Sequence, residues 1–209
     1  MRAFVLSRYG GPEHTAVGEV PKPSPRAGEL LVRVEAAGLN PVDFKTRMGA
    51  LKIIRDYPLP IVMGNELAGV VEAVGAGVTR FTAGDRVYAR VDKDHMGACA
   101  EFAVVHEDHA AVMPASLDFP TAAAVPLAAL TALQALRDEL QLQAGQRIFI
   151  PGGAGGVGTF AIQLAKHMGA HVATTASPRG EALVRRLGAD VVIDYSRERF
   201  EDHLTGYDC

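Results

Sequence analysis

The chain has few cysteines and no long runs of like charge. Its two cysteines, Cys99 and Cys209, lie far apart, which argues against the disulfide framework of a small secreted protein. Because no acidic or basic block stands out, we expect neither nucleic acid nor an anionic membrane as a partner.

Long hydrophobic runs are also missing. The apolar segment between Arg2 and Arg8 is too short for the core of a secretory signal, and residues 122–136 are interrupted by Pro126, Thr131 and Gln134. We therefore expect no membrane span and a cytoplasmic protein. The length of 209 residues suits one large domain or two modest ones.

The composition changes along the chain and predicts two domains, residues 1–116 and 117–209. The first is β-rich, because short apolar runs alternate with Gly and Pro turns, as in a small barrel or sandwich; the runs are 28–35, 69–75, 85–89 and 101–105. In the second, residues 121–140 are predicted to be helical, with a break at Pro126.

Beyond residue 147 the pattern is β-α-β-α-β-α, which predicts a parallel, right-handed α/β sheet. The expected strands are 148–150, 171–176 and 191–193. We expect the second helix to open with Ser177 as N-cap and to close at Gly188, and a short helix to begin at Ser196. This region supplies about one of the two βαβαβ halves of a dinucleotide-binding domain, which suggests a truncated chain.

The most informative motif is G-x-G-x-x-G, which follows the strand 148–150 and opens a helix. Its glycines are Gly153, Gly155 and Gly158, and Gly169 lies where that helix is expected to end. The first glycine permits a tight turn, the second a close approach of the backbone to phosphates, and the third close helix–strand packing. One face of the helix is expected to be apolar, through Val157, Phe160, Ala161, Leu164, Ala165 and Met168.

The end of the second strand indicates which dinucleotide binds. NAD-binding domains carry an acidic residue there for the ribose 2′-hydroxyl, but here the first acid is Glu181, inside the next helix. Ser177 and Arg179 instead offer a hydroxyl and a guanidinium, which suit a 2′-phosphate. We therefore predict NADP(H), although Arg179 at a helix start also fits a solvated surface residue.

Further motifs carry a family resemblance over the whole chain. These motifs are Asn40-Pro41-Val42-Asp43, residues 60–75, Gly84-Asp85-Arg86-Val87, Leu130-Thr131-Ala132, Leu187-Gly188-Ala189-Asp190 and Ile193-Asp194-Tyr195. Together with the glycine loop, they resemble the medium-chain dehydrogenase/reductase superfamily, and in particular its zinc-independent quinone oxidoreductase (zeta-crystallin-like) branch. The resemblance implies a GroES-like β-barrel domain followed by a Rossmann domain.

The resemblance also implies residue roles. It places Asn40 beside nicotinamide and substrate, Thr131 on the carboxamide, Tyr195 near the 2′-phosphate, and Gly155, Gly156 and Val157 at the pyrophosphate. Lys45 stands where some relatives carry a tyrosine, so it is either the donor to the substrate oxygen or a solvated lysine. A longer form of the chain could also assemble into a homo-oligomer.

The resemblance argues against a metal. Zinc members of the superfamily hold their ion with Cys and His where this chain has Asn40 and Asn65, and amides are poor replacements for a thiolate or an imidazole. His106 and His109, with His95 and Cys99 upstream, do not form H-E-x-x-H and are expected to be solvent-exposed.

Two functions stay open at this point. The first is an NADPH-dependent reductase that transfers hydride to a quinone or to an α,β-unsaturated carbonyl, with donors that stabilise the charge on the carbonyl oxygen. The second is a non-catalytic NADPH-binding protein, structural or regulatory, or an inactive fragment of such a reductase. A reductase oxidises NADPH when given substrate, whereas a binder is only stabilised by it.

Overall fold

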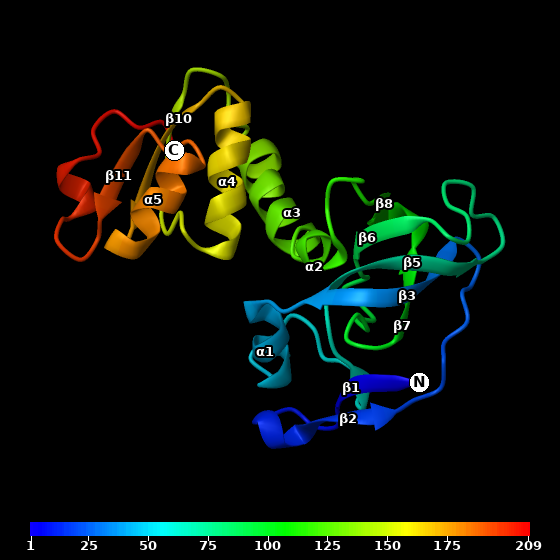
Figure 1. Ribbon diagram of the computed structural model, residues 1–209. Helices are drawn as coiled ribbons and strands as arrows, with labels where there is room; N and C mark the ends of the chain where they lie inside the picture. The colour runs from blue at the N-terminus through cyan, green and yellow to red at the C-terminus, as the bar shows by residue number, and fades with distance from the viewer. The chain divides into compact units, whose positions relative to one another are not determined.

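The computed structural model describes residues Met1–Cys209, which divide into two compact units, Met1–Leu127 and Ala128–Cys209 (Figure 1). Helix α2 (Phe119–Ala123) packs against strands β3 and β5 of the first unit. None of the helices combines the length and the apolar character that crossing a bilayer requires.

The first unit is built from two antiparallel sheets. A three-stranded sheet has the order β2-β1-β4, with β1 at Arg2–Leu6, β2 at Thr15–Glu19 and β4 at Ile61–Val62. A five-stranded sheet has the order β7-β3-β5-β6-β8. Its strands are β3 Glu29–Gly38, β5 Glu66–Val74, β6 Arg86–Arg90, β7 Phe102–His106 and β8 Ala110–Val112. Helix α1 (Pro41–Arg47) follows β3, and short 3-10 turns lie at Pro12–His14 and Glu107–His109.

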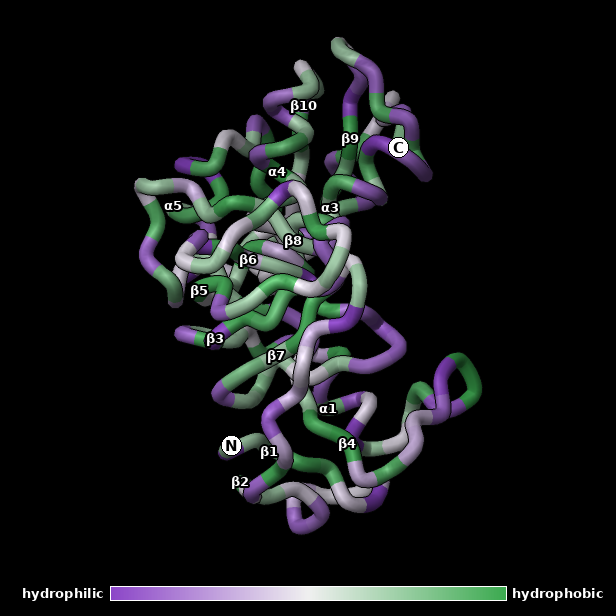
Figure 2. Tube along the Cα trace, turned by 90° about the vertical axis from the view of Figure 1, so that its right-hand side faces the viewer, coloured by the Kyte–Doolittle hydropathy of each residue, from purple (hydrophilic) through white to green (hydrophobic).

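The five-stranded sheet surrounds the core of this unit without closing into a barrel. Leu30, Val32, Leu67 and Val87 are fully buried in one cluster, because apolar side chains of neighbouring strands point to the same side. The sheet ends at β7 and β8, and the two sheets meet through backbone contacts such as the bridge between Ala3 and Ala100. The first unit is thus a pair of hydrogen-bonded sheets. Figure 2 shows that hydrophobic segments occur along the strands and hydrophilic segments in the loops between them.

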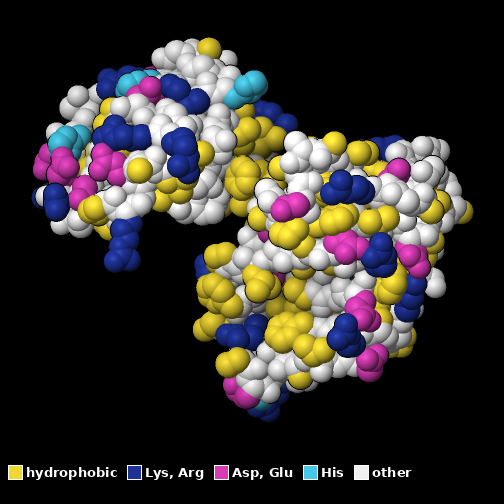
Figure 3. Space-filling model, viewed as in Figure 1, with side chains coloured by type: hydrophobic (Ala, Val, Ile, Leu, Met, Phe, Trp, Pro, Cys, Tyr) yellow, Lys and Arg dark blue, Asp and Glu magenta, His cyan; other side chains and the backbone are white.

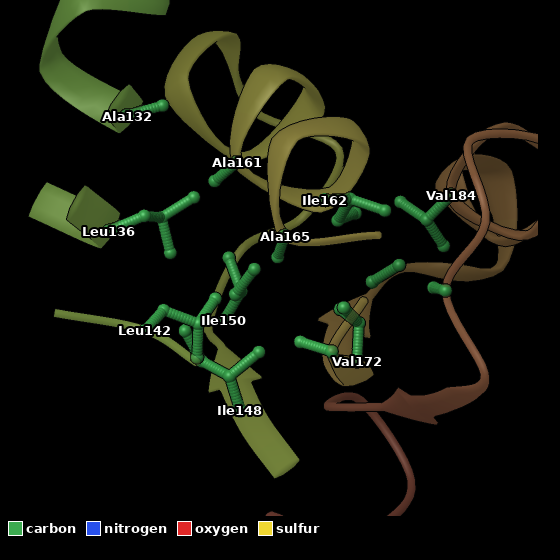
Figure 4. Close-up of a cluster of buried hydrophobic side chains, with 13 residues drawn as sticks. Ala132, Leu136, Leu142, Ile148, Ile150, Ala161, Ile162, Ala165, Val172 and Val184 are labelled. Carbon is green, nitrogen blue, oxygen red and sulfur yellow. The ribbon is translucent and has the colours of Figure 1, made fainter. Parts of the chain in front are cut away.

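The second unit is a three-stranded parallel sheet in the order β11-β10-β9. Strand β9 is Arg147–Ile150, β10 is His171–Ala176 and β11 is Val191–Asp194; helix α4 (Gly156–His167) joins the first pair and α5 (Pro178–Arg186) the second. Both helices cover one face of the sheet, where Ile162 and Val184 meet Ile148 and Val172 (Figure 4). The predicted βαβαβ order is therefore confirmed.

The helical region before β9 is broken where proline predicts it. Helix α2 ends before Pro126, which opens α3 (Pro126–Gln134), and a π-helical turn follows at Ala135–Glu139. A proline at the first position of a helix has no N–H to leave unpaired, so it starts α3 without loss.

Two local expectations were wrong. No regular helix begins at Ser196; Asp194 accepts hydrogen bonds from the backbone and hydroxyl of that serine, which hold a turn, and only a 3-10 turn follows at Phe200–Asp202. On α4, Val157 is 41% exposed, whereas Ile162, which was not expected on the apolar face, is fully buried in the core.

Ile162 tests the core of the second unit. The Ile162→Ala substitution removes a fully buried side chain and should lower the free energy of unfolding by about 2–5 kcal/mol, measured by urea titration. His167→Ala on the exposed side of the same helix is the matched control, expected to change it by less than about 0.5 kcal/mol. Similar losses in both variants would show that Ile162 is not a core residue.

Candidate functional site

The turn after β9 lies against the end of β10 through backbone hydrogen bonds. Gly152 donates its N–H to the Thr175 hydroxyl (2.9 Å), and Gly153 donates to the Thr175 carbonyl oxygen (3.1 Å). Gly155 donates to the carbonyl oxygen of Gly152 (2.9 Å) and is the N-cap of α4. The turn is therefore held by its own backbone and by the neighbouring strand.

Glycines permit this close approach. A Cβ at Gly153 would lie 2.2 Å from the Thr174 hydroxyl oxygen, and one at Gly158 would lie 2.5 Å from the carbonyl oxygen of Gly152. At Gly156 a Cβ would meet nothing within 4 Å, so that side of the turn is open. The first N–H groups of α4 have no partner within the helix and carry the positive end of its dipole. An open helix start of this kind has the chemistry to hold an anion such as a pyrophosphate.

Ser177, Arg179 and Tyr195 lie at the same sheet edge as the glycine loop. Ile150 pairs with Thr174, and Ala176 pairs with Asp194, so the residues that follow these strands emerge side by side. The segments that carry these three residues therefore follow strands whose carboxyl ends lie at one edge of the sheet, where dinucleotides bind in open α/β sheets.

Two polar side chains at this edge, those of Ser177 and Arg179, take no part in the hydrogen bonds or ion pairs that stabilise the fold. Ser177 is the N-cap of α5, as predicted, but its side chain makes no capping hydrogen bond, and Arg179 is exposed without an ion pair. Tyr195 is 61% exposed. Glu181, the first acid after the strand, pairs with Arg185 (2.9 Å) within α5. The edge thus offers a hydroxyl and a cation, while Glu181 is paired with Arg185 and Asp194 accepts two hydrogen bonds from Ser196.

The first unit contains a second polar site, a network of buried side chains around the start of α1. Asp43 accepts hydrogen bonds from the backbone N–H of Asn40 (2.7 Å) and from the Asn65 amide (2.7 Å). Glu66 accepts from the Asn40 amide (2.6 Å) through one oxygen and from the Leu127 N–H (2.7 Å) through the other. Asn65 and Glu66 are each 2% exposed, and Asp43 is 7% exposed.

Burial dominates the electrostatics of this network. It raises the pKa of Asp43 and of Glu66 above their usual values, and the hydrogen bonds from Asn40, Asn65 and Leu127 oppose the shift. The sequence alone assigns no catalytic role to Asp43, Asn65 or Glu66. The available signal was a polar pair, Asn65 and Glu66, within an otherwise apolar strand segment.

The other predicted site residues lie outside these two groups. Lys45 is exposed on α1 and does not line the nearby pocket of about 220 Å³, whose walls include Val42, Thr46, Asn65 and Arg90. Thr131 lies on the exposed side of α3. Figure 3 shows hydrophobic side chains gathered over the region of α1.

The histidines form no metal centre in this structure. The rings of His106 and His109 have centroids 5.9 Å apart, and His106 accepts a hydrogen bond from the Asp108 N–H through its ring. No group of three or more His, Cys, Asp or Glu side chains has the arrangement to hold a metal ion.

Comparison with known proteins agrees with both units. The alcohol dehydrogenase GroES-like domain family matches residues 26–116, and the zinc-binding dehydrogenase family matches residues 156–207. The chain is 42% identical to the chloroplastic NADPH-dependent alkenal/one oxidoreductase of Arabidopsis thaliana, over 100% of this chain and 56% of that protein. It is 40% identical to the 2-methylene-furan-3-one reductase of Solanum lycopersicum, over 97% and 54%.

Solved structures give the same result. The quinone oxidoreductase from Coxiella burnetii superposes with a TM-score of 0.88 at 37% identity, covering 98% of this chain and 65% of that one. The Escherichia coli quinone oxidoreductase, solved with NADPH, gives a TM-score of 0.85 at 32% identity, covering 98% and 61%. The chain spans a little over half the length of the curated relatives that it matches.

Gly153→Ala tests the close approach of the glycine loop. Because the added Cβ would lie 2.2 Å from the Thr174 oxygen, we expect the free energy of unfolding to fall by about 1–3 kcal/mol in a urea titration. Gly156→Ala places its Cβ in open space and is the control, with an expected change below about 0.5 kcal/mol. Equal stability of the two variants would contradict the steric role of Gly153.

Asp43→Asn tests the effect of burial on the network. Because the folded state raises the pKa of Asp43, the stability that this carboxyl contributes is complete below its unfolded pKa of about 3.9 and is lost as the pH rises through the folded pKa. The variant cannot lose this proton. The stability difference between wild type and variant should therefore shrink from about pH 4 to about pH 7 in urea titrations. A difference that grows with pH would show that the hydrogen bonds outweigh burial.

Proposed function

We propose that this chain, which belongs to the medium-chain dehydrogenase/reductase superfamily, carries the NADPH-binding and substrate-facing residues of a reductase for quinones or α,β-unsaturated carbonyls. The observation that carries the proposal is the sheet edge of the second unit, where an open helix start lies beside uncommitted Ser177 and Arg179. The names of relatives, which include alkenal/one and quinone oxidoreductases, support the same reaction class.

The choice of NADPH rests on charge at the strand end. A 2′-phosphate needs hydrogen-bond donors and a cation, and Ser177 and Arg179 have no competing partners in the fold. NAD would instead need an acceptor for its 2′-hydroxyl, and Glu181 is held by Arg185. Tyr195 emerges beside this position from the neighbouring strand.

NADPH supplies the hydride, and the chain supplies binding and charge stabilisation. The first N–H groups of α4, from Gly156 onward, bind the pyrophosphate, while Gly153 and Gly158 keep the turn close enough to the sheet. The half-buried Asn40 presents an amide N–H to the substrate oxygen, where negative charge develops. In this proposal Thr131 contacts the nicotinamide carboxamide, and Lys45 stays a weaker candidate donor because it is exposed on α1.

The reaction that we propose uses no zinc. At the positions where zinc relatives have Cys and His, the amides of Asn40 and Asn65 already donate to Glu66 and Asp43. These amide nitrogens donate hydrogen bonds and do not bind a cation, and the remaining amide oxygens are poor replacements for the thiolate and imidazole that zinc prefers. These residues therefore do not fit a tetrahedral zinc site. Stoichiometric zinc in the purified protein would contradict this part of the proposal.

Three further expectations stay predictions. They are a cytoplasmic location, a homo-oligomer for a longer form, and a domain boundary after residue 116. Several of the relatives carry chloroplastic or mitochondrial names, which describe those proteins.

The decisive experiment measures NADPH oxidation by this chain and by the full reading frame that contains it, with a quinone and a 2-alkenal as substrates. We expect turnover in the longer protein. Thermal stabilisation by NADPH without turnover in either form would favour the non-catalytic binder, because binding alone stabilises the folded state. Turnover in the longer protein alone would identify this chain as an inactive part of a reductase.

Arg179→Ala tests the choice of cofactor. Loss of a hydrogen bond to a charged phosphate costs about 1.5–3 kcal/mol, so we expect NADPH to bind roughly ten- to hundredfold more weakly, measured by fluorescence titration. NADH affinity should stay within about twofold, because NADH has no 2′-phosphate. Arg186→Ala, in the last turn of the same helix, is the control. An equal loss of NADPH and NADH affinity would contradict the assignment of Arg179.

A further inference from the structure

The geometry points to Glu66 as a positioning residue that holds the Asn40 amide in one orientation, with nitrogen toward Glu66 and its second N–H left for the substrate oxygen. The inference rests on the proposed function, in which Asn40 faces the substrate. Its basis is the 2.6 Å hydrogen bond from the Asn40 Nδ2 to the Glu66 Oε1, between residues 26 positions apart in the chain.

The orientation follows from the chemistry of the two groups. An ionised carboxylate only accepts hydrogen bonds, whereas a primary amide has an accepting oxygen and two N–H donors. If the Asn40 amide turned over, its oxygen would face the Glu66 oxygen at hydrogen-bonding distance and both would repel. The reciprocal capping box with Asp43 fixes the backbone of Asn40 as well. One Nδ2 hydrogen is thus used by Glu66, and the other is free to donate.

Glu66 is itself held in place. It lies on the central strand β5, paired with Gly38 on β3 and with Arg90 on β6. Its Oε2 accepts the N–H of Leu127 (2.7 Å), one residue after Pro126 opens α3. This N–H belongs to the first turn of the helix, which has no internal partner, so the carboxylate also caps α3 from a distant strand.

The surroundings leave room for this carboxylate and little else. A Cβ at Gly38 would lie 2.2 Å from the Glu66 Oε1 and 2.8 Å from the carbonyl oxygen of Ala123. Asp43 and Arg90 are the charged groups that act on Glu66, the first against ionisation and the second in favour of it. With its two oxygens engaged by different donors, Glu66 has no freedom to turn away from Asn40.

Glutamine at this position breaks the arrangement without changing its size. Its one oxygen satisfies either Leu127 or Asn40, and its NH2 group then faces the other donor. If the oxygen stays on Leu127, the glutamine NH2 favours the turned-over amide, which presents oxygen to the substrate. Protonation of Glu66 at low pH has the same consequence, because the protonated oxygen becomes a donor.

The first test measures turnover in the full reading frame with a 2-alkenal. We expect Glu66→Gln to lower kcat by about tenfold to a hundredfold, with the NADPH Kd within about twofold. In wild type, kcat should fall at low pH as Glu66 becomes protonated. This fall should be absent in Glu66→Gln, which has no carboxyl group to protonate. Glu72→Gln is the matched control, because Glu72 lies on the same strand but is exposed and pairs with Lys22.

A double-mutant cycle separates positioning from general stability. In an Asn40→Ala background, Glu66→Gln should lower kcat by less than about twofold, because the amide to be positioned is gone. If Glu66→Gln lowered kcat by the same factor in the Asn40→Ala background as in wild type, the inference would be overturned. A Glu66→Gln variant that keeps kcat within about twofold of wild type would also overturn it.

A second measurement uses this chain alone and requires no turnover. In ¹⁵N-labelled protein, the side-chain NH2 resonances of Asn40, assigned through Asn40→Ala, should move as Glu66 titrates. That movement should vanish in Glu66→Gln and persist in Glu72→Gln. Resonances that titrate identically in Glu66→Gln would overturn the contact. Absence of NADPH oxidation by the wild-type full reading frame would instead reject the proposed function, and the resonances would still decide the contact.

Discussion

Close contact between the turn after β9 and the end of β10 is the constraint on which the second unit depends. The distance is so short that a single methyl group at Gly153 would overlap the Thr174 hydroxyl. Because the turn lies close to the sheet, α4 begins directly at the sheet edge and its core face packs with Ile148 and Val172. The space beside its first residue, Gly156, is open. A bulkier turn would move the start of α4 away from the sheet. Core packing by the helix and anion binding at its first N–H groups both depend on this one close contact.

In the first unit, buried carboxylates and their hydrogen bonds determine how the polar side chains are oriented. Around the start of α1, Asp43 and Glu66 are buried among apolar strands and are compensated by donors from Asn40, Asn65 and Leu127. Burial raises the pKa of both carboxyls, so the network carries a cost that well-packed apolar residues would avoid. The network also determines the orientation of the Asn40 and Asn65 side-chain amides. Hydrogen bonds to acceptor-only groups determine which end of an amide faces which neighbour, and hydrophobic contacts have no such directionality.

The two regions differ in how far sequence alone could predict them. The glycine loop, the strand at 171–176 and the Ser177 cap are local signals, because motif, strand end and helix start are contiguous, and the structure has these elements as expected. The contact between Asn40 and Glu66 depends on the pairing of β3 with β5, which contains two register shifts that no local pattern announces. The sequence pattern left a small barrel or a sandwich open for the first domain, and the hydrogen bonds form two sheets. The helical periodicity placed Val157 in the core, where Ile162 is buried instead.

Gly38 and Glu66 also have a consequence for how this sequence can vary over evolutionary time. Their backbones are paired across two strands, and the space that the glycine leaves is filled by the carboxylate oxygen and the Ala123 carbonyl. A shorter residue 66 would relieve only one of the two contacts that a methyl at residue 38 makes, because the Ala123 carbonyl oxygen belongs to the backbone. A shorter residue 66 would also leave Leu127 and Asn40 without their acceptor. Glycine at residue 38 and glutamate at residue 66 are therefore each constrained by the same small space, and few substitutions are open to either position.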